Sequence, residues 1–224
     1  MSEDGRAPRR RTQAERVDAS GRALLEAAAE LISERGWAST TAAEIGRRAG
    51  YSRAMVAARF GGKDALLDTL LEREYESRLV AAAPEGLPGF ERALLPLVRL
   101  ARLHREEPEF LASMFVLNFE AANRTTSLRP RMAGWMERIV AFVADGLRAA
   151  RLDGSLRRDV DLDALLAEIV SRGVGAAYLW VMLPDRFDFA AEVDRLRADV
   201  LARFGVTAGS EAPTDRRVAP GGAP

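Results

Sequence analysis

TTAAEIGRRAGYSRAMVAARFGGK, residues 40–63, contains two short helical patterns separated by a glycine-bearing turn. Apolar residues at helical spacing predict the inner faces of these two helices: Ala42, Ala43, Ile45 and Ala49 in the first, and Ala54, Val56, Ala57 and Phe60 in the second. Gly50 stands between them and can adopt the positive φ that a sharp turn requires. Such a pair forms a helix-turn-helix over about residues 41–60, whose second helix can enter the major groove of DNA.

The sequence before this stretch predicts a further helix and a polar arm. Apolar residues recur at spacings of three and four between about Ala19 and Arg35, which predicts an amphipathic helix. Gly36 is placed to end that helix, and Thr41 with Glu44 three residues later is a capping-box pattern for the next one. Residues 1–18 are polar and charged, so they are predicted to be a flexible basic arm.

The remainder of the chain also predicts helices. Helical patterns cover residues 64–79, 88–106, 108–123, 130–151, 161–183 and 189–204. No sustained alternation of apolar and polar residues indicates a strand. The fold class is therefore all-α, with a small N-terminal unit at residues 19–65 and a larger helical domain at residues 66–205. The tail, 206–224, is rich in Gly, Pro and Ala and is predicted to be disordered.

Composition excludes several kinds of chemistry. The chain has no cysteine and one histidine, His104, which excludes disulfides and a Cys/His zinc site. No nucleophile-elbow motif accompanies that histidine, and no glutamate stands three residues before it as in di-iron bundles. We therefore expect no catalytic residue, no metal and no cofactor. The longest uncharged runs, Gly173–Pro184 and Phe110–Phe119, are too short to span a bilayer, so a cytoplasmic protein without membrane contact is expected.

Charge is distributed unevenly along a chain whose formal net charge is zero. Residues 1–64 carry 12 basic and 9 acidic side chains, a surplus of 12 − 9 = +3, and the remainder carries the matching deficit. A basic front joined to an acidic body suits a protein that meets phosphate at one end. Arg9–Arg11 are either a solvated charge run or a basic arm that reaches the minor groove.

The motifs quoted above resemble the TetR family of transcriptional repressors. The resemblance is carried by ERGW at Glu34–Trp37, by TTAAEIGRRAG and YSRAMVAARF, and by GGKDALL at Gly61–Leu67. It covers roughly residues 19–67, and beyond that point only the helical architecture is shared. The resemblance implies a helix-turn-helix DNA-binding domain followed by an effector-binding and dimerisation domain. It also implies a palindromic operator in double-stranded DNA and a homodimer.

The resemblance also implies roles for individual residues of the N-terminal unit. Thr41 would cap the second helix and face a phosphate, Ser52 would start the recognition helix, and Lys63 would contact phosphate. The residues expected to meet DNA are Thr41, Arg48, Ser52, Arg53, Met55, Arg59 and Lys63. Chemistry agrees with these roles, because Arg reads guanine bidentately and Met can contact a thymine methyl group.

The recognition helix departs from the family pattern. Where the family usually carries a tyrosine and then polar aromatic or histidine residues before the phenylalanine, this chain has Ala57 and Ala58, with Arg59 before Phe60. A tyrosine contact therefore cannot be carried over to Ala57. Base recognition is expected to depend on Arg53 and Met55, with Arg59 supplying charge.

The larger domain contains many large, soft side chains that are either ordinary core or the wall of an apolar effector cavity. The candidate ligand-binding residues are His104, Met114, Phe115, Asn118, Phe119, Met132, Trp135, Met136, Tyr178 and Trp180. The apolar helical patterns at 161–183 and 189–204 suit an isologous dimer interface. The function expected is a homodimeric repressor released by a small, largely apolar ligand. A helical adaptor without DNA binding and a carboxylate-based enzyme are the alternatives.

Overall fold

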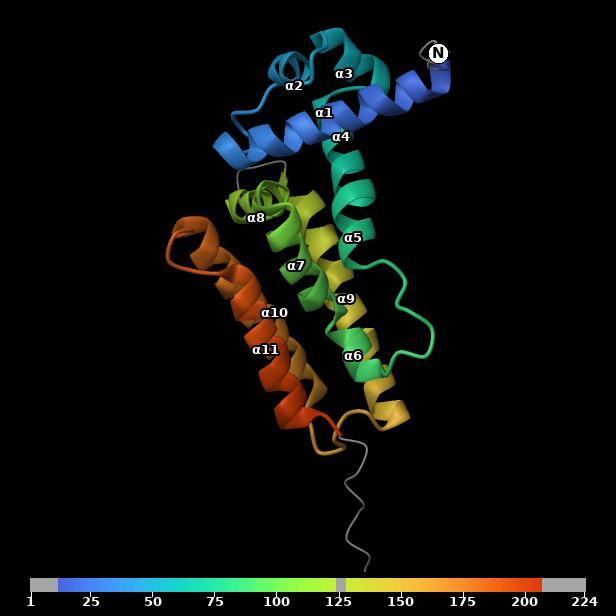
Figure 1. Ribbon diagram of the computed structural model, residues 1–224, viewed down its shortest axis with the longest axis vertical. Helices are drawn as coiled ribbons and strands as arrows, with labels where there is room; N and C mark the ends of the chain where they lie inside the picture. The colour runs from blue at the N-terminus through green and yellow to red at the C-terminus, as the bar shows by residue number, and fades with distance from the viewer. Residues whose placement is uncertain (1–11, 124–127, 207–224) are drawn as a thin grey trace, which may run out of the picture.

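The computed structural model describes residues 12–123 and 128–206 of the chain. Within these ranges every regular element is a helix, which confirms the all-α prediction. The elements are α1 (Gln13–Arg35), α2 (Ala42–Arg48), α3 (Arg53–Phe60), α4 (Lys63–Thr69), the π-helix η1 (Leu70–Glu76), α5 (Ser77–Leu79), α6 (Gly89–Ala93), α7 (Leu95–Glu106), α8 (Pro108–Ala121), α9 (Leu128–Asp153), α10 (Leu162–Met182) and α11 (Phe189–Phe204). Helices α1 to α3 lie at one end of an elongated molecule, and the remaining helices form its body (Figure 1).

The first helix begins earlier than the sequence pattern predicts. Thr12 accepts a hydrogen bond from the backbone N–H of Glu15, and the Glu15 carboxylate accepts one from the backbone N–H of Thr12. This capping box starts α1 at Gln13, so the predicted arm is wrong for residues 13–18. The rest of that arm, with Arg9–Arg11, lies outside the described residues. At the other end, Gly36 ends α1 with a φ of 76°, as predicted.

The inner faces of α2 and α3 are narrower than the apolar pattern predicts. Ile45 and Val56 are fully buried, whereas Ala43, Ala54 and Ala57 are exposed. A short helix at the end of a molecule buries only the stripe that meets its neighbours, and alanine carries little apolar surface that burial would favour. The exposed alanines therefore belong to the outer surface of the helix-turn-helix.

A long helical segment, residues 63–79, connects the N-terminal unit to the body; we call it the lever segment. It consists of α4, η1 and α5, and so it is not the uninterrupted α-helix that the sequence pattern indicates. The buried phenol of Tyr75, within η1, shares a hydrogen bond of 2.6 Å with Ser113 of α8. Burial raises the pKa of Tyr75 well above its usual value, so this hydroxyl stays protonated. The π-helical turns place this side chain against α8.

The lower body depends on a close contact between α6 and α9. A Cβ atom on Gly146 would lie 2.5 Å from the Cα of Ala93, and one on Gly89 would lie 2.2 Å from the backbone nitrogen of Ala150. Both glycines therefore allow two helix backbones to approach more closely than any side chain would permit. The end of α9 is tied to the same region, because the backbone N–H of Gly89 donates to the Asp153 carboxylate at 2.6 Å.

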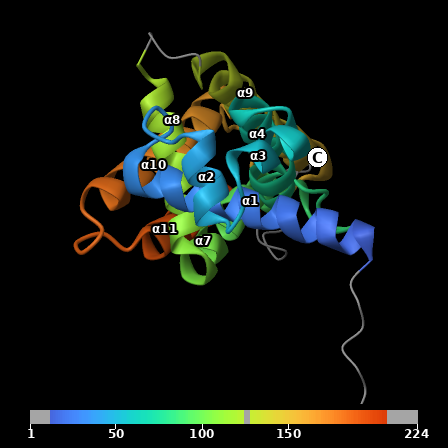
Figure 2. The same cartoon turned by 90° about the horizontal axis from the view of Figure 1, so that it is seen from above.

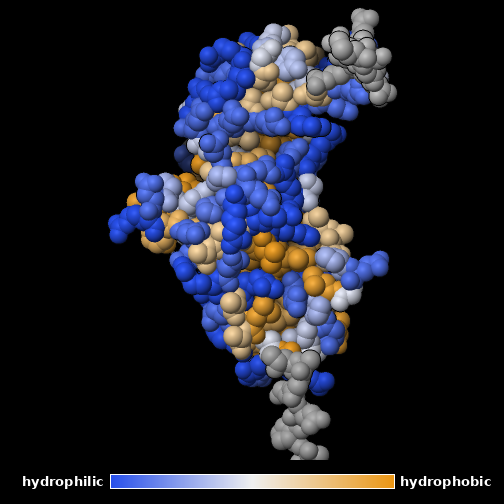
Figure 3. Space-filling view, viewed as in Figure 1, coloured by the Kyte–Doolittle hydropathy of each residue, from blue (hydrophilic) through white to orange (hydrophobic). Residues whose placement is uncertain are grey.

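Helix α10 is apolar in composition, although several of its large apolar side chains are exposed. By length and composition it could cross a membrane, and only 28% of its apolar window is buried within the chain, so most of that window faces outward. Val174, Tyr178, Leu179 and Met182 are exposed along it. Figure 3 shows hydrophobic residues on the lower, C-terminal half of the visible face, whereas polar residues follow the band occupied by α1. An ion-pair network that joins Glu168 and Arg172 to α11 holds α10 in place.

Candidate nucleic-acid interface and effector cavity

The turn between α2 and α3 requires two glycines. Gly50 has a φ of 77°, as the sequence predicts. Gly46 is the glycine that the sequence pattern misses: a Cβ there would lie 2.7 Å from the carbonyl oxygen of Ser52. The Gly46 carbonyl also accepts a hydrogen bond of 2.7 Å from the backbone N–H of Tyr51. These contacts fix the start of α3 against α2.

Helix α3 leaves one side open to solvent at the end of the molecule. Figure 2, a view onto that end, shows α1, α2 and α3 in front of the body. Ser52, Arg53, Ala57 and Ala58 are exposed, and Ser52 precedes α3 without making a side-chain capping bond. Arg53 forms no ion pair within the described part of the chain. Met55 differs from the prediction, because it is half-buried and packs against the core.

Three other predicted DNA-contacting residues are already engaged within the N-terminal unit. The Thr41 hydroxyl donates to the Glu44 carboxylate at 2.7 Å and caps α2. Arg48 forms ion pairs with two carboxylates of α1, those of Glu30 at 3.0 Å and Glu34 at 2.7 Å. These partners raise the pKa of Arg48. The Arg59 guanidinium is also held toward α1, where its Nε donates to Ser20 at 3.0 Å.

Lys63 belongs to a cluster that joins the N-terminal unit to the body. Its ammonium donates to the Trp37 carbonyl at 2.7 Å and lies 4.0 Å from the centre of the Trp37 indole. Burial lowers the pKa of Lys63, while the carboxylates of Asp64, Glu120 and Glu44 act in the opposite direction. Lys63 therefore stabilises the loop after α1 in addition to any contact with phosphate.

Glu120 of α8 holds the other side of that loop, and no local sequence pattern predicts it. Its carboxylate accepts hydrogen bonds from the backbone N–H groups of Trp37 at 2.6 Å and Ala38 at 2.8 Å. Gly36 makes room for this approach, because a Cβ there would lie 2.9 Å from the Glu120 carboxylate. We call the contact of Glu120 with Trp37 and Ala38 the Glu120 latch. It spans 83 residues of sequence and connects α8 to the helix-turn-helix unit.

An apolar cavity of about 70 Å³ lies in the body. Four of the predicted ligand-binding residues line it: Met114, Phe115, Trp135 and Met136. The sequence pattern misses the aliphatic side chains that complete the wall from α7, α9 and α10, among them Leu97, Leu100, Ile139 and Ile169. They were missed because a regular apolar helix face looks the same whether it meets another helix or a cavity.

The other six predicted ligand-binding residues lie outside this wall. They are His104, Asn118, Phe119, Met132, Tyr178 and Trp180. The four aromatic ones form a cluster beside the cavity, in which the His104 ring lies 4.8 Å from the Trp180 ring and the Phe119 ring lies 5.4 Å from the Tyr178 ring. Phe115 of the cavity wall joins this cluster, because its ring lies 6.4 Å from that of Trp180. Asn118 donates to the Met114 carbonyl within its own helix, and Met132 is ordinary core.

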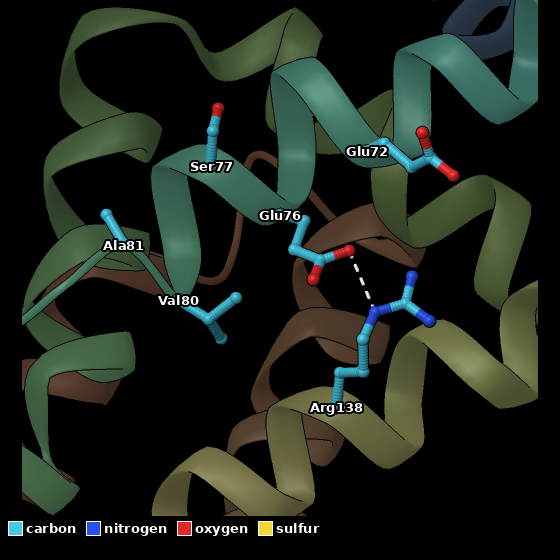
Figure 4. Close-up of a pocket in the computed structure, with 6 residues that line it drawn as sticks. All are labelled: Glu72, Glu76, Ser77, Val80, Ala81 and Arg138. Atoms are coloured by element: carbon cyan, nitrogen blue, oxygen red, sulfur yellow. Dashed lines mark hydrogen bonds and ion pairs between the residues drawn. The ribbon is translucent and has the colours of Figure 1, made fainter.

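A second hollow, at the surface, borders the lever segment. It is lined by Glu72, Glu76, Ser77, Val80, Ala81 and Arg138. Figure 4 shows the Glu76 carboxylate and the Arg138 guanidinium pointing toward one another, with 2.8 Å between Oε2 and Nε. Arg131, which precedes Arg138 on α9, pairs with Asp68 of α4 at 2.6 Å. Two ion pairs therefore join the lever segment to α9, and this hollow lies over that junction.

Comparison with known proteins agrees with this arrangement. Residues 24–70 match the sequence model of the bacterial regulatory proteins of the tetR family. No curated protein matches the sequence. The fold is similar to that of SmeT, the repressor of the Stenotrophomonas maltophilia multidrug efflux pump SmeDEF, with a TM-score of 0.67 and 21% identity over 93% of this chain and 99% of SmeT.

Two further solved structures have the same fold. TylP, a TetR regulator from Streptomyces fradiae, has a TM-score of 0.67 and 21% identity, covering 88% of this chain and 90% of TylP. FadR from Bacillus subtilis, solved in complex with stearoyl-CoA, has a TM-score of 0.66 and 17% identity, covering 81% of this chain and 97% of FadR. The matched domain contains the turn of Gly46 and Gly50 and the exposed α3, and this N-terminal part of the chain, residues 24–70, belongs to the tetR family of bacterial regulatory proteins.

Proposed function

We propose that this regulator is a homodimeric repressor that binds a palindromic operator and is released by a small, largely apolar ligand. The observation that carries the proposal is the exposure of α3 at the end of the molecule, with Arg53 open to solvent. In a dimer, two such helices enter successive major grooves of one duplex in the cytoplasm. Ser52 and Arg53, at the start of α3, are the first candidates for contact with DNA, because helix N-termini favour phosphate and Arg reads guanine.

The remaining predicted contacts separate into two groups. We propose that Thr41 and Lys63 contact phosphate in addition to their roles in the fold, where they bond to Glu44 and to the Trp37 carbonyl. Arg48 and Arg59 face α1, so a contact with DNA would require them to leave their present partners. We therefore assign base recognition chiefly to Arg53 and leave Met55 to the core.

The dimer interface that we propose is the exposed apolar face of α10. Ser171, Val174, Tyr178 and Met182 recur on it at spacings of three and four. Pairing this face with its copy would remove from water the apolar surface that one chain leaves exposed. Gly175 lies on the same face and has no side chain, which allows the two helices to approach closely.

The ligand signal, in this proposal, travels through two routes that begin at the cavity wall. Helix α8 carries Met114 and Phe115 in the wall and the Glu120 latch at its far end. Helix α9 carries Trp135 and Met136 in the wall and is joined to the lever segment by its ion pairs. A ligand that swells the cavity displaces both helices, and this favours a state in which the recognition helices no longer fit one duplex.

Operator binding tests the proposal directly. Fluorescence anisotropy with the DNA that flanks the gene should give an affinity that falls steeply with salt, as phosphate contacts require. Arg53→Ala should weaken specific binding by about 1–3 kcal/mol if it makes a bidentate base contact. Arg102→Ala, which removes an exposed arginine of α7, is the matched control and should change little. Failure of the chain to bind any DNA would favour the alternative function, a helical adaptor that does not bind DNA. Ala57 and Ala58 of α3 are the reason for this alternative.

A further inference from the structure

Among the described residues that line the cavity, only Trp135 has a nitrogen or oxygen in its side chain, and that nitrogen has no hydrogen-bond partner. Trp135 is 2% exposed, and its indole Nε1 is buried without a hydrogen bond. A buried indole N–H normally finds an acceptor, because leaving it unpaired costs free energy. In the described residues, the Nε of Arg197 on α11 is the only other side-chain nitrogen or oxygen in this condition. The unpaired donor of Trp135 therefore needs an explanation that involves the cavity it lines.

The other side chains of the wall cannot provide that acceptor. They are aliphatic, aromatic or thioether groups, and the described wall holds no charged or amide side chain. A water molecule would not satisfy the donor well, because a buried water needs two to four polar partners and the side chains here offer one. An acceptor for Trp135 is therefore best supplied by a ligand.

The same wall limits the charge of the ligand. An ionised group placed among such side chains would lose its hydration without gaining an ion-pair partner, at a cost of many kcal/mol. Met114 and Met136 also line the cavity, and their flexible thioether chains can rearrange to admit a molecule larger than the present cavity of about 70 Å³. The site is thus suited to a neutral molecule of adaptable shape.

We infer that the cavity binds an uncharged, apolar molecule with one hydrogen-bond acceptor, such as a ketone or ester oxygen, which accepts from the indole N–H of Trp135. The inference rests on the proposed function, since it specifies the ligand of the proposed regulator. It assigns the selectivity of the site to one donor in an otherwise apolar wall. A carboxylate or ammonium ligand of the same size should be rejected.

Three small probes built on the same six-membered ring test this assignment on the full chain. Cyclohexanone and methylenecyclohexane have nearly the same shape, but only the ketone accepts a hydrogen bond, and cyclohexanecarboxylate adds a charge. Binding is followed by NMR of the three tryptophan indole N–H groups. The Trp135 resonance is assigned by its loss in Trp135→Phe. We expect that resonance to shift with the ketone, and we expect no saturable binding of the carboxylate.

The decisive quantity is the ratio of the two dissociation constants, Kd of methylenecyclohexane over Kd of cyclohexanone. Trp135→Phe should lower this ratio about tenfold, as loss of one hydrogen bond to a buried donor implies. The phenylalanine ring of Trp135→Phe is smaller than indole and leaves a void, but the void affects both probes alike. Its effect therefore cancels in the ratio of the two dissociation constants. Trp180→Phe, which changes a buried tryptophan of the neighbouring aromatic cluster, should leave the ratio unchanged.

Two results would overturn the inference. One is an equal ratio in the wild type and in Trp135→Phe, and the other is the absence of ketone binding at the Trp135 resonance. Operator binding, measured separately by anisotropy, distinguishes these failures from a failure of the proposed function. A chain that binds its operator but not the ketone would remain a repressor with a different kind of ligand.

Discussion

Removing the Glu120 carboxylate should shift the balance between the operator-bound and ligand-bound states. The side chain accepts two hydrogen bonds, from Trp37 at 2.6 Å and Ala38 at 2.8 Å. A hydrogen bond to a charged group contributes about 1.5–3 kcal/mol when it is protected from water. The Ala38 bond is exposed and the Trp37 bond is half-buried, so solvent screening lowers each contribution to about 1 kcal/mol, and the pair contributes about 2 kcal/mol. That free energy corresponds to a factor of roughly 30 in an equilibrium constant.

This factor appears in a ratio that does not depend on the starting populations. Suppose that the operator binds only the latched state and the ligand only the unlatched state. The ratio of operator Kd to ligand Kd is then inversely proportional to the equilibrium constant, defined as the population of the latched state divided by that of the unlatched state. Glu120→Ala should therefore raise that ratio about 30-fold. Glu120→Gln keeps one acceptor oxygen, so it should raise the ratio by roughly the square root of that factor, about fivefold.

The measurement needs two affinities for each variant. Operator Kd is obtained by fluorescence anisotropy, and cyclohexanone Kd is obtained from the Trp135 indole resonance. Glu109→Ala removes an exposed carboxylate from the opposite end of the same helix and should change neither constant. A lower Tm with an unchanged ratio in Glu120→Ala would show that the latch only fastens the two domains together, and the coupling mechanism would be refuted.

Further predictions concern the turn, the histidine and the dimer. Gly46→Ala should lower the free energy of unfolding by about 1–3 kcal/mol, because the new Cβ meets the backbone of Ser52. Gly21→Ala, which meets nothing within 4 Å in α1, should raise it by up to about 1 kcal/mol, and equal effects in urea melts would contradict this reasoning. Burial lowers the pKa of His104 despite the nearby Asp188, so the unfolded chain takes up the proton first. The contribution of His104 to stability is thus complete above its unfolded pKa of about 6.5 and is lost as the pH falls through the folded pKa. His104→Gln should flatten that slope in urea melts from pH 5 to 7.5, and an unchanged slope would assign it to other groups. Tyr178→Asp should dissociate the dimer in sedimentation experiments, whereas Leu152→Asp, at a site that is 88% exposed on α9, should not; a Tyr178→Asp dimer would place the interface elsewhere.

Local interactions explain the parts of the fold that the sequence predicts well. The Thr41 and Glu44 capping box, the end of α1 at Gly36 and the positive φ of Gly50 each depend on a few consecutive residues, and all three are confirmed. The one capping box that was missed, at Thr12 and Glu15, has the same spacing. It was overlooked because it stands in a polar stretch without the apolar periodicity that marks a helix.

The functional contacts were harder to predict because they are long-range. Glu120 looks like any surface carboxylate until folding places it against Trp37, and Gly46 looks like a weak residue inside a short helix. Cavity residues such as Leu97 and Ile139 have the spacing of ordinary core. Sequence pattern identifies which face of a helix is apolar, but not which element lies against that face.

The two alanines on α3 affect how the regulator can read DNA. Ala57 and Ala58 are exposed beside Arg53 on a helix whose only fully buried side chain is Val56. Without a large side chain at these two places, the backbone of α3 can approach the floor of the groove, where alanine can contact a thymine methyl group. In the function that we propose, Arg53 at the N-terminal end supplies the hydrogen bonds that a tyrosine would otherwise share. Specificity in this chain should therefore come from one guanine contact and from close shape fit rather than from several polar contacts along the helix.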